Sequence, residues 1–176
     1  NMVAPKGTFH VDAEKNRISV VALPFPNLPV VAWVQDMEGN YIHEIPAPHL
    51  RIAFDFSNEV EAPRATKGDL SFHISTFFEP RQDTLYHLIA EQGKLIPQFT
   101  IDFGNRKIGP HHFYELPSHY YGYVSDIKQT NQNLFDYDNI RYFIVEKKTG
   151  KGNYCRIYDD YLYDREVTWL LGANGY

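Results

Sequence analysis

The stretch that decides the fold is residues 84–101, TLYHLIAEQGKLIPQFTI, in which an apolar strand, a polar turn with one glycine and a second apolar strand follow one another. The same pattern occurs at residues 30–45, VVAWVQDMEGNYIHEI, and at residues 141–158, RYFIVEKKTGKGNYCRIY. Runs of β-branched and aromatic residues on both sides of a glycine turn indicate β-hairpins. The turns are spaced 54 and 57 residues apart, at Gly39, Gly93 and Gly150. This spacing indicates a repeat architecture.

Two more strand-like segments precede each hairpin. They are residues 7–11 with 17–23, residues 50–56 with 70–77, and residues 112–115 with 120–124. Each unit therefore carries four predicted strands, which is the content of one blade of a β-propeller. Several strands are apolar on both faces, and this is typical of a sheet that is covered on both sides.

The chain is therefore expected to be all-β, with residues 1–176 forming a single partial β-propeller domain. The predicted blades are approximately residues 7–45, 50–103 and 111–158, followed by an incomplete fourth at 161–176. The alternative is an antiparallel β-sandwich made from the same strands. Propellers close with roughly four to eight blades, so the expected partners include the remainder of the propeller or a second copy of the chain. Residues 57–68 and 125–133 are predicted to be loops.

Composition excludes several classes of partner. The net charge is −5 and no basic stripe is present, so nucleic acid and anionic membrane surfaces are not expected partners. No apolar run approaches the roughly 20 residues that span a bilayer. The single cysteine, Cys155, lies in a predicted strand and is interpreted as a small buried apolar residue.

The most specific pieces of sequence surround the second hairpin. Residues 83–86, DTLY, and 94–104, KLIPQFTIDFG, resemble segments of uncharacterised six-bladed β-propeller proteins of gut-type bacteria, many of which are predicted lipoproteins. Residues 33–36, 56–59 and 112–117 are also similar to that family.

The resemblance implies a propeller fold and an extracytoplasmic location, in the periplasm or at the cell surface. It implies membrane attachment only through a lipid anchor on an N-terminus that this chain lacks. Asn1 precedes Met2 and no signal-peptide pattern follows, so the chain is expected to be processed or to be a piece of a longer protein. The resemblance implies that it is about half of one. The family has no established activity that the resemblance could assign to particular residues.

The candidate ligand-binding residues lie in the segment that opens the third unit, because inner strands and their loops line the channel of a propeller. They are His112, Tyr114, Glu115 and His119. A metal site is not predicted there, since His111 and His112 are adjacent in a strand and point to opposite faces. No cofactor is predicted. The chain has no nucleophile elbow, phosphate loop or Cys-x-x-Cys motif.

The function predicted from these features is a non-catalytic binding or interaction module that recognises a glycan, a peptide or a protein. A metal-dependent hydrolase of the lactonase type is an alternative, on the grounds of fold analogy alone. A structural scaffold, whose activity resides in other blades, is a second alternative.

Overall fold

The computed structural model describes residues 6–55, 57–62, 69–131, 134–156, 158–159 and 165–166. Within these residues the structure consists of antiparallel strands, and its one helical element is the short 3-10 helix η1 (Pro48–Leu50). No helix in this part of the chain is long and apolar enough to cross a membrane. The all-β prediction is confirmed.

Three four-stranded antiparallel sheets follow one another along the chain, and in each sheet the strands lie in chain order. Sheet 1 contains β1 (Gly7–Asp12), β2 (Arg17–Ala22), β3 (Ala32–Gln35) and β4 (Tyr41–Ile45). Sheet 2 contains β5 (Glu59–Glu61), β6 (Leu70–Ser75), β7 (Thr84–Ile89) and β8 (Lys94–Thr100). Sheet 3 contains β9 (His111–Glu115), β10 (His119–Asn131), β11 (Leu134–Glu146) and β12 (Gly152–Cys155).

The last two strands of each sheet form the hairpins predicted from the repeat. Gly39, Gly93 and Gly150 occupy their turns with φ angles of 90°, 60° and 67°. An L-residue with a side chain rarely adopts these angles, which explains why glycine recurs at the same place in each unit.

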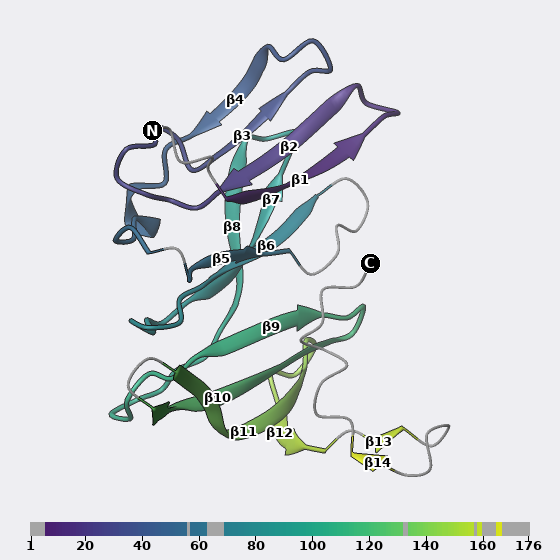
Figure 1. The fold of residues 1–176 in the computed structure, drawn as a ribbon. Helices are drawn as coiled ribbons and strands as arrows, with labels where there is room; N and C mark the ends of the chain where they lie inside the picture. Colours follow the sequence, from purple (N-terminus) through teal and green to yellow (C-terminus); the bar gives the residue numbers. More distant parts are fainter. Residues whose placement is uncertain are drawn as a thin grey trace.

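The sheets are stacked in chain order, with sheet 2 in the middle (Figure 1). One face of sheet 1 packs against one face of sheet 2, and its buried members include Val21, Val34, Leu70, Phe72 and Ile74. These residues alternate along their strands, so each strand contributes every second side chain to the core. The alternation of side chains along the strands therefore places these residues in the core between the two sheets.

Sheets 2 and 3 share a second and more aromatic core. Leu85, Phe113, Val124 and Phe143 are buried there, and Phe99 packs against them. The Phe99 ring centroid lies 5.4 Å from that of Phe113, with the rings nearly perpendicular. Edge-to-face pairs of this kind stabilise a core beyond the area that they bury.

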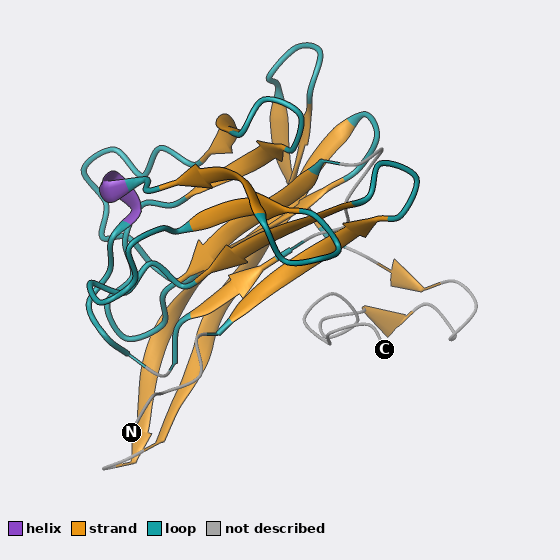
Figure 2. Ribbon diagram, turned by 90° about the horizontal axis from the view of Figure 1, so that it is seen from above, coloured by secondary structure: helices purple, strands orange, loops and turns teal. Residues whose placement is uncertain are grey.

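Residues 125–131, the described part of β10 within the segment 125–133 that was predicted to be a loop, are strand. β10 and β11 are each 13 residues long and pair as far as Asn131 and Leu134, with bulges after Val124 and Gln129. Figure 2 shows one long two-stranded ribbon that reaches beyond the other strands. The polar side chains face solvent, and pairing between the two strands satisfies the backbone hydrogen bonds. A polar sequence is therefore compatible with a strand here, and the loop prediction was wrong.

The strand predicted at residues 50–56 is absent from its described part, and sheet 2 begins instead at β5. The backbone of this segment pairs with other partners: Ile52 N donates to Pro24 O at 3.1 Å. The Arg81 guanidinium donates to the carbonyl oxygens of Leu50 and Arg51 at 2.9 and 3.0 Å. Tertiary contacts therefore override the apolar alternation of the segment.

Three stacked sheets are present, where the sandwich alternative would have two, and none of the three closes on itself. A separate two-stranded pairing joins β13 (Tyr158–Asp159) to β14 (Arg165–Glu166). The predicted incomplete fourth unit, residues 161–176, otherwise lies outside the described residues.

Candidate functional site

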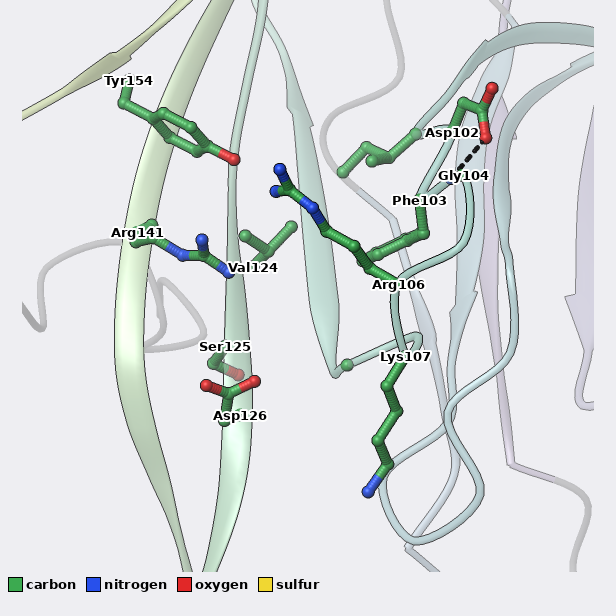
Figure 3. A pocket seen from close by; sticks show the side chains of 12 residues that line it. Asp102, Phe103, Gly104, Arg106, Lys107, Val124, Ser125, Asp126, Arg141 and Tyr154 are labelled. Carbon is green, nitrogen blue, oxygen red and sulfur yellow. Dashed lines mark hydrogen bonds between the residues drawn. The ribbon is translucent and has the colours of Figure 1, made fainter.

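The candidate site is a cleft of about 520 Å³ between the β8–β9 connection and sheet 3. We call it the basic cleft. One wall is the connection, and the other is formed by β10, β11 and β12 (Figure 3). Its polar and aromatic lining comes from Asp102, Phe103, Arg106, Lys107, Ser125, Asp126, Arg141 and Tyr154. The volume lies within the range of about 300–1,000 Å³ that is usual for ligand pockets.

Local hydrogen bonds shape the connection that forms the first wall. Asp102 Oδ1 accepts a hydrogen bond from Gly104 N at 2.7 Å, and Arg106 N donates to Phe103 O at 3.0 Å. Gly104 has a φ of 55°, which its lack of a side chain permits. The Phe103 ring packs against the core between sheets 2 and 3. The turn is therefore held at Phe103, and it presents Arg106 beside the cleft.

The opposite wall places a second guanidinium beside an aromatic ring. Arg141 Cζ lies 5.7 Å from the ring centroid of Tyr154, at the distance of a cation–π contact. Arg106 extends from its own wall toward the strands that carry Arg141 and Tyr154 (Figure 3). Lys107 points away along the edge of the cleft (Figure 3).

The cleft carries more positive than negative charge. Among the described residues, none of Arg106, Lys107 and Arg141 forms an ion pair. The two carboxylates of the lining accept other hydrogen bonds: Asp102 from Gly104 N, and Asp126 from Asn139 Nδ2 at 3.0 Å. The cationic side chains therefore keep their donors for an anionic group, which guanidinium binds through parallel hydrogen bonds.

The sequence-predicted residues lie elsewhere, and none of the four lines the basic cleft. His112 is on β9, with Nε2 3.3 Å from Ser75 Oγ and its ring stacked on Tyr123 at 4.9 Å between centroids. Burial, with smaller contributions from the nearby His73 and His111, lowers the pKa of His112 to about 3. The imidazole is therefore neutral at pH 7, and its 3.9 Å approach to Glu61 is not an ion pair there.

Tyr114 lies two residues further along β9, on the same face of the strand as His112. Its ring centroid is 5.9 Å from that of Tyr121. Burial raises the pKa of Tyr114 to about 12, so the phenol keeps its proton at neutral pH. The structure thus brings His112 and Tyr114 to one half-buried, aromatic face of sheet 3.

Glu115 points to the other face of β9 and accepts three hydrogen bonds. Its carboxylate lies 2.5 Å from His87 Nε2, 2.6 Å from Lys147 Nζ and 3.1 Å from Ser71 Oγ. Burial raises the pKa of Glu115, but the hydrogen bonds and positive charges of Lys147 and His87 lower it by more. The net effect is a pKa below the usual range of a glutamate. This cluster joins sheet 2 to sheet 3 across their interface.

His119 begins β10 and is separate from the other three predicted residues. Its Nδ1 lies 2.8 Å from the hydroxyl of the preceding Ser118. The structure therefore brings together two of the four predicted residues, His112 and Tyr114. A ligand-binding role for the four stays a prediction.

A buried His–Asp pair that the sequence did not indicate also lies between sheets 2 and 3. His73 Nδ1 lies 3.1 Å from Asp83 Oδ2, and Ile74 N donates to the same oxygen at 2.6 Å. Phe113 N donates to His73 Nε2 at 3.3 Å, so the imidazole bridges β6 and β9. The two residues are ten positions apart in the sequence, and no local pattern connects them.

The cationic residues of the basic cleft were also missed by the sequence reasoning. The available signal was the polar, glycine-containing turn at residues 102–107, directly after the second hairpin. The described residues contain no group of three or more His, Cys, Asp or Glu side chains that could hold a metal ion. No family model, curated protein or solved structure matches this chain.

Proposed function

We propose that this protein is a non-catalytic binding module that recognises a ligand with an anionic group in the basic cleft. The observation that carries the proposal is that Arg106 and Arg141 face one cleft of about 520 Å³ from opposite walls, without ion-pair partners among the described residues. Lys107 adds a third cation at the edge of the cleft. The Tyr154 ring beside Arg141 adds a surface on which a sugar or another ring can stack. Within the predicted range of glycan, peptide or protein ligands, acidic glycans and acidic peptides fit this lining.

The proposed architecture is a set of propeller blades at an extracytoplasmic location. Three features support the blade arrangement: the chain-order meander in each sheet, the face-to-face stacking, and an uncovered apolar face on sheet 1. Phe9, Val11 and Tyr41 on that face are 67%, 45% and 58% exposed. In a propeller, an adjacent blade would cover such a face. The location follows only from the resemblance described above, and fractionation of the native host tests it.

The binding proposal is tested with a charge-removing variant and a matched control. Arg106→Gln with Arg141→Gln removes two cleft cations, while Lys94→Gln with Lys148→Gln removes two exposed cations outside the cleft. The readout is an amide NMR titration with acetate, glucuronate and an oligoglutamate peptide, after circular dichroism has shown that both variants are folded.

At least one probe is expected to shift the amide signals of residues 101–109 and 124–126. Because hydrogen bonds to charged groups contribute about 1.5–3 kcal/mol, the cleft variant should weaken binding about tenfold or more. The control should bind as the wild type does. Equal affinities for the two variants, or no shift at the cleft with any probe, would refute the proposal.

A further inference from the structure

An apolar hollow of about 410 Å³ continues the basic cleft along sheet 3. Ile101, Val124 and Tyr154 line both spaces. The rest of the hollow is lined by Phe99, Phe143, Val145, Gly152 and Asn153. One continuous surface thus changes from cationic at Arg106 and Arg141 to apolar at Phe143 and Val145.

The register of sheet 3 explains why the hollow stays open. On its outer pair of strands, Gly152 lies opposite Val145 and Tyr154 lies opposite Phe143. Gly152 has no side chain, and a Cβ placed there would approach Val145 Cγ2 to 2.5 Å. β12 therefore contributes no side chain over Val145, which stays only half-buried.

We infer, on the basis of the proposed function, that the ligand is amphipathic: a carboxylate that carries an aliphatic or aromatic tail. The carboxylate would pair with Arg106 and Arg141, and the tail would lie in the hollow against Val145 and the Tyr154 ring. Charge complementarity selects the head group, because a neutral or cationic head would leave the two guanidinium groups unpaired. The apolar lining selects the tail, because burial of methylene groups is favourable and roughly proportional to the area buried.

The test compares ligands that share one head group. Acetate, hexanoate and 3-phenylpropanoate are titrated against the whole 176-residue chain by amide NMR, with hexan-1-ol as the neutral analogue of hexanoate. Each methylene that enters the hollow should tighten binding up to about fourfold. Hexanoate is therefore expected to bind at least about tenfold more tightly than acetate, and hexan-1-ol more weakly than hexanoate.

Val145→Thr is the matched variant, because threonine has nearly the shape of valine and adds one hydroxyl to the hollow. It should weaken hexanoate about threefold or more and leave acetate unchanged, whereas the Arg106→Gln/Arg141→Gln variant should weaken both. If Val145→Thr does not fold, Tyr154→Leu tests the contact with the ligand's tail instead, because the Tyr154 side chain is exposed and its replacement should not disturb the core. It should weaken 3-phenylpropanoate more than hexanoate.

The two proposals fail in different ways. If the arginine variant weakens acetate while tail length and Val145→Thr have no effect, the anion site stands and the amphipathic ligand is refuted. If hexan-1-ol binds as tightly as hexanoate and the arginine variant changes neither affinity, the anion site itself is refuted, and with it the inference.

Discussion

Two histidines at the interface of sheets 2 and 3 differ in their burial and in their hydrogen-bond partners. His73 is bridged between Asp83 and the backbone of β9, so both of its ring nitrogens are hydrogen-bonded. His112 has only Ser75 Oγ within hydrogen-bonding distance of Nε2 and lies among aromatic rings. Protonation of His112 in the folded state would place a charge in surroundings that solvate it poorly. The nearest carboxylate, Glu61, lies 3.9 Å from Nδ1, and burial raises the pKa of Glu61 and so disfavours its charged form. This residue therefore makes the stability of the fold sensitive to pH.

We predict that the free energy of unfolding decreases as the pH falls from about 6.5 toward 3. The pKa of His112 is lowered to about 3 in the folded protein, whereas an unfolded chain protonates histidine near pH 6.5. Between these values the unfolded state binds more protons, so acid favours unfolding, by about 3–5 kcal/mol over the whole window. His111, whose pKa burial also lowers, adds to the same slope.

Urea unfolding at pH 7, 5.5 and 4 measures this slope for the wild type and for His112→Gln. The glutamine cannot be protonated, and its amide can still pair with Ser75. The variant should therefore lose much less stability than the wild type between pH 7 and pH 4. The same slope in both proteins would contradict the assigned burial of the imidazole.

At the scale of the elements, the repeated hairpins differ in how tightly their turns are packed. Gly93 and Gly150 both have positive φ angles, 60° and 67°. A Cβ on Gly93 would meet His43 Cγ at 2.5 Å, whereas a Cβ on Gly150 would meet no atom within 4 Å. The turn of sheet 2 is thus pressed against β4 of sheet 1, while the turn of sheet 3 is free of such contact with the described residues.

Alanine substitutions at these two glycines should separate backbone strain from packing. Gly150→Ala incurs only the left-handed backbone cost and should lower the free energy of unfolding by about 1 kcal/mol. Gly93→Ala must also displace His43 and should cost about 2–3 kcal/mol. Urea unfolding of the two variants checks the order. Equal losses, or a larger loss for Gly150→Ala, would show that sheets 1 and 2 are not packed as described.

At the scale of the whole molecule, the two faces of sheet 1 are both apolar, but only one is covered. Val21 and Val34 are fully buried against sheet 2. On the opposite face, Phe9 pairs with Val20 and Val11 pairs with Ile18, and no described element packs on them. Exposed apolar patches of this kind mark interaction surfaces.

The uncovered face should bind a hydrophobic dye. We expect Phe9→Thr with Val11→Thr to reduce the fluorescence of Nile red, a dye without an anionic group, by more than half in the presence of the protein. Threonine keeps the β-propensity of both positions, so the unfolding transition should change little. Ile96→Thr, on an exposed residue of sheet 2, is the control and should leave the dye signal unchanged. Equal dye binding by all three proteins would show that this face is covered in solution.

The candidate site was harder to predict from the sequence than the fold was. The segment around residue 112 was predicted to bind a ligand because inner strands line the channel of a propeller. In the structure, His112, Tyr114 and Glu115 take part in packing and in hydrogen bonds between sheets, and their binding role stays a prediction. The basic cleft is built from Arg106 on a connection and Arg141 on β11, which are 35 residues apart. Neither residue belongs to a motif, so composition could not single them out.

The sequence by itself determined the all-β character, the hairpin at the end of each unit and the three glycine turns. These depend on short-range properties, namely side-chain alternation within a strand and the φ angles that only glycine adopts readily. Tertiary structure alone decided that residues 51–55 are not a strand, that residues 125–131 are, and that a cationic cleft opens beside an apolar hollow. The physical reason is that backbone hydrogen-bond partners, burial and the meeting of distant charges are set by contacts between segments far apart in the chain.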